Sequence, residues 1–341
     1  MKGLELKLTY YIKKIRYSFH IELVSLRDFG VKVAWLHFLK SFIFRRNSGV
    51  GARIYTVRYD TLKDRISDQF AEVEDQYFSR QEREEDSLKI GKDAPIWMFW
   101  WQGIDTNTPK AVIDCLQSIN THKSAHVVHV ISKNNIHDYL NLPKFYTDLL
   151  NGGKMSFTHF SDIIRFELLA QYGGIWLDAT IMLTSDLPSI AEESQFYTIH
   201  HGQFSDWHVS LGKWSTFCIA SGKGNPMMAY MRDMNRAYWQ KYDYSVCYLL
   251  IDCFIAIAYD RWAYFREIMD TVPLNNPDVF FLDDHANSGY KKVVADKIFS
   301  RTIIFKLHYK RTFCEYDNEN QLTYYGKVVN DNRNIGGESL E

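Results

Sequence analysis

Residues 160–180 read FSDIIRFELLAQYGGIWLDAT, and this stretch decides the fold. Apolar residues recur in it at helical spacing, at Phe160, Ile164 and Leu168. The spacing predicts an amphipathic helix, and the Gly-Gly pair suits its left-handed end. The apolar run 175–177 then predicts a short buried strand that delivers Asp178 to its carboxyl end. Ligands bind at that edge of open α/β sheets, so the same segment predicts a site.

Strands and helices alternate on both sides of this segment. Apolar or β-rich runs predict strands at 96–101, 126–131, 181–183, 195–200, 214–220 and 301–309. Helices are expected to begin near Thr108, Asn134, Asn225 and Ser245. The alternation is typical of a doubly wound α/β fold with a Rossmann-like sheet.

Charge is unevenly distributed along the 341 residues. The net charge is −1, yet residues 1–48 hold ten Lys or Arg and only three Asp or Glu. We therefore expect a helical N-terminal extension at 1–93, basic and then acidic, a main domain at 94–316 and a loosely ordered tail at 317–341. The basic, aromatic arm suits peripheral contact with an anionic membrane. The alternative is a helical appendage packed on the main domain.

The cysteines and the apolar runs of the sequence indicate where in the cell the protein is expected. The five cysteines form no C-x-x-C pair and lie in apolar contexts, which predicts reduced core thiols in a cytosol. No signal peptide and no run long enough to span a bilayer is visible. We expect a cytoplasmic protein, peripheral on the inner face of the cell membrane, with no nucleic-acid partner.

The quoted stretch also contains a combined motif, S-D-x-x-R at 161–165 followed by G-G-x-x-x-D at 173–178. This motif resembles that of the sugar-nucleotide glycosyltransferases of the capsular polysaccharide synthesis family. It is similar, more distantly, to bacterial toxin glucosyltransferases and yeast-type mannosyltransferases. The resemblance runs from about 95 to about 310. It implies a GT-A-type domain that transfers a hexose, of galactose or glucose type, from a UDP-sugar with retention of configuration. The implied acceptor is a lipid-linked oligosaccharide in the synthesis of a bacterial capsular or surface polysaccharide.

The resemblance also implies roles for the charged residues of the motif. Asp162 would accept hydrogen bonds from sugar hydroxyls, and Arg165 would hold the sugar or the diphosphate. Asp178 would lie at the diphosphate or at a divalent metal, Mn²⁺ or Mg²⁺. Related families carry a second acid where this chain has Thr180, so metal dependence stays open. His308 is a candidate second metal ligand, with an ordinary surface histidine as the alternative.

Aromatic residues at the end of the first predicted strand are candidates for the nucleotide base. Trp101, Gln102 and Gly103 match a W-x-G pattern of related families, and either Trp100 or Trp101 would stack on uracil. Adjacent strand residues point to opposite faces, so only one of the two indoles can do so.

Three further features are candidates for the site. Asp252 lies within an apolar helical stretch, where a carboxyl is costly unless it is paired or functional. It would orient the acceptor, flank the anomeric carbon or pair with an arginine. Lys306 or Lys310 would add positive charge at the diphosphate. The polar stretch 283–289 is expected to be a mobile loop, either a lid or simply solvated.

A binding protein without catalytic activity is the alternative to an enzyme. The missing second acid at Thr180 is compatible with a degenerate fold that binds glycan or nucleotide sugar without turnover. A phosphotransferase or nucleotide-sugar hydrolase would need a further acid cluster, which the sequence does not show.

Overall fold

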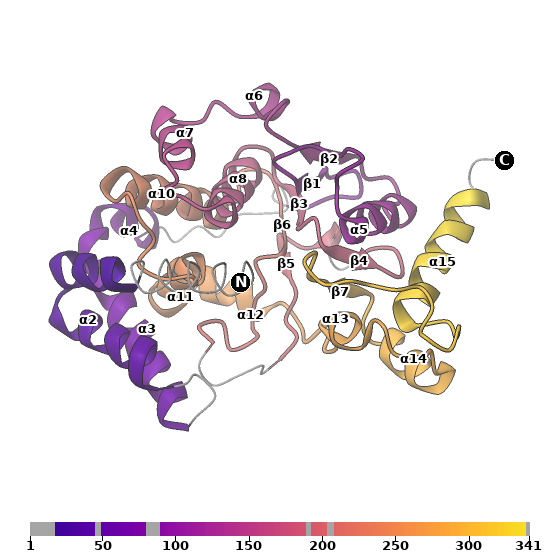
Figure 1. Ribbon diagram of the computed structural model, residues 1–341. Coiled ribbons are helices and arrows are strands. Elements are labelled where there is room, and N and C mark those ends of the chain that lie inside the picture. Colours follow the sequence, from indigo (N-terminus) through magenta and orange to yellow (C-terminus); the bar gives the residue numbers. More distant parts are fainter. Residues whose placement is uncertain (1–17, 45–48, 80–88, 189–191, 203–207, 339–341) are drawn as a thin grey trace.

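The computed structural model describes residues 18–44, 49–79, 89–188, 192–202 and 208–338. A mixed five-stranded sheet with strand order β2-β1-β3-β6-β5 lies at the centre, with helices on both sides (Figure 1). Its strands are β1 (Ile96–Phe99), β2 (Val128–Ile131), β3 (Gly174–Leu177), β5 (Phe196–Thr198) and β6 (Cys218–Ser221). The first three run parallel, and β6 is antiparallel to both β3 and β5. The predicted α/β class is confirmed, and every predicted strand of this sheet is found; all except β3 are shorter than predicted.

Alternation along the strands creates two hydrophobic layers. Trp97 and Phe99 of β1 belong to one cluster, and Ile96 and Met98 belong to the other. This is the period of two that a pleated strand imposes. The first layer is covered by α8 (Phe157–Tyr172), α10 (Pro226–Lys241) and α11 (Leu250–Arg261), and the second by α5 (Lys110–Thr121). The central sheet is therefore buried on both faces.

A second, two-stranded sheet continues directly from the first. β4 (Ile181–Leu183) is separated from β3 by three residues and pairs antiparallel with β7 (Ile304–Lys306). Lys306 lies opposite Ile181 in this ladder, and the Leu307 amide donates to the Thr180 carbonyl oxygen at 2.9 Å. Residues 178–180 thus connect the two sheets, and β7 approaches this connection from a distant part of the chain.

The helix predicted from the opening stretch is more deeply buried than its sequence suggests. Ser156 caps α8, because its hydroxyl oxygen accepts from the His159 amide. From Phe160 to Leu169 nearly every side chain is buried, charged residues included. The prediction of an amphipathic helix is wrong on this point, because α8 lies between the sheet and α10 rather than at the surface. Glu167 illustrates the difference, since it is buried and forms a two-bond ion pair with Arg236 of α10.

The two glycines that follow α8 are required by a close approach of backbone segments. Gly173 and Gly174 have φ angles of 68° and 104°, in the region that favours glycine. A Cβ atom on Gly174 would lie 2.4 Å from the carbonyl oxygen of Pro95, and one on Gly173 would lie 2.5 Å from the amide nitrogen of Lys223. The pair therefore lets α8 turn sharply into β3, as predicted.

Replacement of Gly174 by alanine is expected to reduce the free energy of unfolding by about 3 kcal/mol or more, because backbone strain and overpacking act together. Gly153→Ala is the matched control. Its φ is also positive, at 67°, but its Cβ would meet open space, so the loss should be about 1–2 kcal/mol. Denaturant unfolding of the two variants measures the difference. Equal losses would show that strain at positive φ, and not the contact with Pro95, sets the cost.

N-terminal helices pack against the helical layer of the main sheet. They comprise residues 18–29, α2 (Val31–Phe38), a π-helical turn (Leu39–Ile43), α3 (Gly49–Gln69) and α4 (Ala71–Phe78). α3 contacts α11 and α4 contacts α10, and all belong to one hydrophobic cluster. Residues 1–17 and 45–48, with much of the basic charge, lie outside the described residues. The domain boundaries at 93 and 316 stay predictions. None of the helices in the described ranges is long and apolar enough to cross a membrane.

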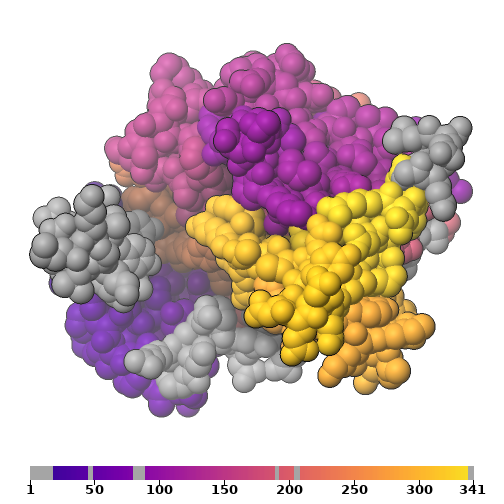
Figure 2. All heavy atoms as spheres, turned by 45° about the vertical axis from the view of Figure 1, so that its right-hand side comes forward, coloured from indigo at the N-terminus to yellow at the C-terminus, as the bar shows by residue number. Residues whose placement is uncertain are grey.

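The C-terminal region corrects two predictions. Residues 324–338 form α15 (Tyr324–Glu338), whose buried Tyr325 and Val328 pack with Cys115 of α5, so this part of the tail is not loosely ordered. Figure 2 shows α15 in yellow across the surface of the molecule. Part of the predicted mobile loop is helical as α13 (Phe281–His285), because its Leu282 is buried beside β7.

The remaining helices of the described ranges are α6 (Ile136–Tyr139), α7 (Lys144–Asn151), α12 (Ala263–Asp270) and α14 (Lys292–Phe299).

Candidate active site

Asp178 lies at the carboxyl end of β3 and accepts hydrogen bonds on both carboxylate oxygens. Its Oδ1 accepts from Arg165 Nη2 at 3.0 Å and from Trp176 Nε1 at 2.8 Å. Its Oδ2 accepts from Lys306 Nζ at 2.7 Å. Burial alone would raise the pKa of Asp178, but the positive charges of Lys306 and Arg165 outweigh burial and hold the pKa well below its usual range. Asp178 is therefore a carboxylate across the physiological pH range.

Arg165 joins the two acidic residues of the motif. Its Nη1 donates to Asp162 Oδ1 at 2.5 Å, and its guanidinium lies 4.9 Å from the centre of the Trp176 ring. Only 3% of its side chain is exposed, so the pairs with Asp162 and Asp178 are shielded from water. Within the described part of the chain, its Nε has no hydrogen-bond partner. The structure thus brings Asp162, Arg165 and Asp178 together, and the i,i+3 pair of Asp162 with Arg165 is buried and not a pair on the surface.

Lys306 completes a row of four alternating charges. It reaches Asp178 from β7 and also donates to Thr180 Oγ1 at 2.8 Å. The ring of Phe217 lies 5.3 Å from its Nζ atom. The order Asp162, Arg165, Asp178, Lys306 gives two carboxylates and two cations, which balance. Burial raises the pKa of Asp162, although the charge of Arg165 opposes this rise. We call these four residues the charge row.

Asp252 faces the charge row from α11. Its side chain is buried, with 6% of the residue exposed, and Trp214 Nε1 donates to its Oδ1 at 2.9 Å. Burial raises the pKa of Asp252 to about 7, and the negative charge of Asp162 adds to the rise. The structure pairs Asp252 with the indole of Trp214 and not with an arginine, so the alternative of an ion pair with arginine is wrong. Asp252 is thus a carboxyl that can hold or release a proton near neutral pH.

The raised pKa of Asp252 makes stability depend on pH. An unfolded Asp titrates near 3.9, so the folded protein binds this proton more tightly and loses stability as the pH rises from about 4 to about 7. Asp252→Asn keeps the acceptor for Trp214 and removes the titration. At about 1.36 kcal/mol per pKa unit, the variant should gain up to roughly 4 kcal/mol relative to the wild type across this window. Denaturant unfolding at pH 4, 5.5 and 7 measures it, and a constant difference would contradict the assignment.

Three aromatic residues of the site, Trp176, Tyr248 and Trp214, are not among the residues predicted from the sequence. Trp176 lies two residues before Asp178 on the same face of β3, so strand alternation could have revealed it. Tyr248 precedes Asp252 by four residues, a helical spacing that was available as a signal. Tyr248 is 73% exposed. Desolvation of its hydroxyl and the negative charges of Asp162, Asp178 and Asp252 raise the pKa of Tyr248. Nothing in the sequence signalled Trp214.

The two predicted base-stacking residues point in different directions from the end of β1. Trp100 packs edge-on against Tyr309, with ring centres 5.5 Å apart, just beyond β7. Trp101 packs edge-on against Phe160 of α8 at 5.4 Å. The expectation of opposite faces is confirmed. Gln102 follows them and is exposed. The nucleotide-binding role of these residues stays a prediction.

The residues present do not fit the predicted metal site. The oxygens of Asp178 already accept from Arg165, Trp176 and Lys306. His308 is exposed, and its backbone amide donates to Asp283 Oδ1 at 2.8 Å. Among the residues that the structure describes, no three His, Cys, Asp or Glu side chains are grouped so as to hold a metal ion. A divalent cation prefers several oxygen ligands, and this donor set offers one carboxylate that two cations already neutralise.

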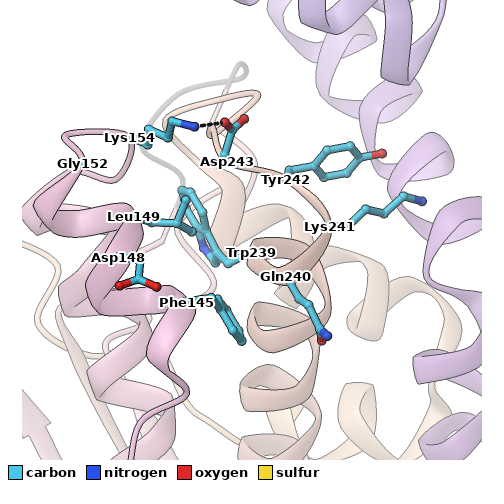
Figure 3. Close-up of a pocket in the computed structure, with 10 residues that line it drawn as sticks. All are labelled: Phe145, Asp148, Leu149, Gly152, Lys154, Trp239, Gln240, Lys241, Tyr242 and Asp243. Atoms are coloured by element: carbon cyan, nitrogen blue, oxygen red, sulfur yellow. Dashed lines mark hydrogen bonds and ion pairs between the residues drawn. The ribbon is translucent and has the colours of Figure 1, made fainter.

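A surface hollow lies apart from the charge row. It has a volume of about 370 Å³ and is lined mainly by α7, α10 and the loop before α8. Figure 3 shows Trp239 and Phe145 in it, and Lys154 paired with Asp243 at its edge. None of the four charge-row residues lines it. The ring centre of Trp239, which lines the hollow, lies 5.6 Å from that of His159 in α8.

Comparison with known sequences identifies the class of protein. Residues 45–328, which include the whole charge row, match the family described as capsular polysaccharide synthesis protein. The chain belongs to this family.

Similar proteins include two fungal glycosyltransferases. The glycosyltransferase afumC of Aspergillus fumigatus is 24% identical over 158 residues, covering 42% of this chain and 40% of that protein. The O-glycosyltransferase braB of Annulohypoxylon truncatum is 23% identical over 164 residues, covering 44% of this chain and 38% of that protein. The chain thus matches well under half of the length of these relatives. Among solved structures, PaToxG glycosyltransferase aligns over 74% of this chain and 95% of its own, with 13% identity and a TM-score of 0.35.

Proposed function

We propose that this protein is a GT-A-type glycosyltransferase that transfers a hexose from a UDP-sugar, of galactose or glucose type, with retention of configuration. One observation carries the proposal: a row of alternating charges, buried at Asp162 and Arg165 and half-buried at Asp178 and Lys306, lies at the carboxyl end of β3 in a homologue of glycosyltransferases. Such transfer needs cations at the diphosphate, polar partners for the sugar and a placed acceptor hydroxyl.

The charge row supplies the first two needs. Lys306 and Arg165 stabilise the negative charge that develops on the departing diphosphate. Asp162 accepts hydrogen bonds from the sugar hydroxyls. We assign the exposed side chain of Tyr248, whose pKa responds to the charges of Asp162 and Asp178, to the sugar, to which its ring would offer an apolar face. The base and ribose are assigned to the end of β1, at Trp100, Trp101 and Gln102, with Thr180 at the diphosphate end.

Asp252 is the residue that we assign to the acceptor. It is a buried carboxyl near the charge row with a proton available near neutral pH. In a retaining front-face reaction, the acceptor oxygen bonds to the anomeric carbon as the bond from that carbon to the phosphate oxygen breaks. The acceptor proton moves to the departing phosphate. Asp252 accepts a hydrogen bond from the acceptor hydroxyl and orients it.

The proposed acceptor is a lipid-linked oligosaccharide in the synthesis of a surface polysaccharide. The family description supports a polysaccharide product, whereas the two fungal relatives give no support for the bacterial setting that the sequence suggested. The N-terminal helices expose apolar side chains suited to peripheral contact with a membrane, namely Phe19, Leu23, Leu26, Val31, Trp35 and Phe42. Lys32 and the basic residues near it add attraction to anionic lipid.

A degenerate binding protein is the second candidate. Thr180 occupies the position of the second acid, and both oxygens of Asp178 are already engaged. Such a protein would bind a nucleotide sugar or a glycan at the same charge row without cleaving it.

Slow hydrolysis across a panel of UDP- and GDP-sugars separates the two candidates. A transferase should release nucleoside diphosphate from one donor well above the rest, and the anomer first seen by NMR should retain the donor configuration. Binding of a donor without any release would favour the degenerate protein. Absence of both binding and release for every donor would contradict the assignment to nucleotide sugars.

A further inference from the structure

Thr180 and Asp178 are bridged by one side chain from a distant strand. Lys306 Nζ lies 2.7 Å from Asp178 Oδ2 and 2.8 Å from Thr180 Oγ1. We propose that the ammonium group of Lys306 takes the place of a divalent cation at this site, so that the protein binds the diphosphate of its donor without metal. This inference rests on the proposed function and specifies how the leaving group is held.

The charges at the site agree with an ammonium group in the place of a metal ion. Two carboxylates at positions 178 and 180 would balance a doubly charged metal ion. This chain has one carboxylate and one hydroxyl there, and a singly charged ammonium gives the same balance. A divalent cation added there would bring two further positive charges to a charge row that is already neutral, and it would lie beside Lys306, which already pairs with Asp178. Coulomb repulsion from Lys306 and Arg165 at this half-buried position disfavours that arrangement.

The position of Lys306 is fixed by the fold. β7 pairs with β4, and the Leu307 amide bonds to the Thr180 carbonyl oxygen, so the backbone of β7 runs directly beside residue 180. The Phe217 ring lies against the ammonium group on another side. An ammonium group has three donors, and Asp178 and Thr180 accept from two of them. The Lys306 side chain is 23% exposed, which leaves the third donor for a phosphate oxygen.

Nucleotide binding with and without metal tests the inference. Isothermal titration of the wild type with UDP and with GDP is carried out in a chelator and again in Mn²⁺. For the nucleotide that binds more tightly, the dissociation constant should agree within about twofold between the two conditions. Lys306→Met should weaken binding by about tenfold or more, as expected for the loss of one charge-assisted contact. Lys297→Met, at an exposed lysine of α14, is the matched control and should bind as the wild type does.

A double variant provides a second readout, independent of whether Lys306→Met alone folds well. Lys306→Met with Thr180→Asp restores two carboxylates and removes the ammonium group. Electron paramagnetic resonance should then detect Mn²⁺ bound to the double variant and not to the wild type, and Mn²⁺ should strengthen its nucleotide binding. Wild-type binding that rises tenfold or more with Mn²⁺ would overturn this inference alone. Failure of the wild type to bind either nucleotide would overturn the proposed function, and this inference with it.

Discussion

Asp178→Asn is expected to lower the rate of donor cleavage by about 10²–10³-fold, the range seen when one preorganised electrostatic group is removed from an active site. The carboxylate positions both Arg165 and Lys306, through bonds of 3.0 and 2.7 Å. An amide can accept from one of them only, and its NH₂ group would face the other cation. Steady-state hydrolysis of the selected UDP-sugar measures the effect.

Asp148→Asn is the control for this variant. Asp148 is an exposed aspartate of α7 whose carboxylate pairs with Lys144, and its replacement should leave the rate unchanged. Circular dichroism should show that both variants are folded at 25 °C. A rate for Asp178→Asn within about threefold of the wild type would remove Asp178 from the proposed chemistry, since the expected loss is far larger.

Arg165→Leu is expected to cause the largest loss of stability, about 3–5 kcal/mol in the free energy of unfolding. The side chain is almost fully buried and holds two carboxylates, Asp162 and Asp178. Its removal leaves Asp162 buried without its cationic partner, which is the costly event when one member of a buried pair is lost. Urea unfolding at pH 7 measures the change.

Arg65→Leu offers a closely matched comparison. Arg65 also pairs with an aspartate three residues away on a helix, Asp68, but both side chains are largely exposed. Its loss should cost no more than about 1 kcal/mol. Equal effects of the two substitutions would mean that burial of the Arg165 pairs contributes nothing, and would undermine the electrostatic description of the site.

The local features of the fold could be predicted from the sequence. The Gly-Gly turn, the buried strand before Asp178 and the convergence of Asp162 with Arg165 depend on residues within twenty positions of one another. Their geometry follows from helical spacing and from the conformational needs of glycine. Asp252 could be singled out for a related reason, since a lone carboxyl in an apolar helix requires an explanation.

Long-range contacts do not follow from the spacing of residues within one segment. Lys306 could be named as a candidate for the diphosphate, but its contact with Asp178 spans 128 positions and depends on the pairing of β4 with β7. The hydrogen bond between Trp214 and Asp252 likewise joins residues that are far apart in the sequence, by 38 positions. The burial of α8 on all sides depends on α10, which its own spacing does not reveal. These contacts arise from tertiary packing, which a pattern in a single segment does not encode.

The helix at the C-terminus was missed for a different physical reason. α15 contains several asparagines and glycines, which have low helix propensity. Such a segment would not form a stable helix alone, and packing of its aromatic residues provides the stability. Tyr325 is fully buried, and its hydroxyl donates to Asp114 of α5.

A crystal structure of the protein with UDP would show whether the charge row is the site of the donor. We expect diphosphate oxygens within hydrogen-bonding distance, about 2.7–3.2 Å, of Lys306 Nζ, with the uracil ring against Trp100 or Trp101. Nucleotide bound instead in the hollow beside Trp239, with the charge row untouched, would contradict it.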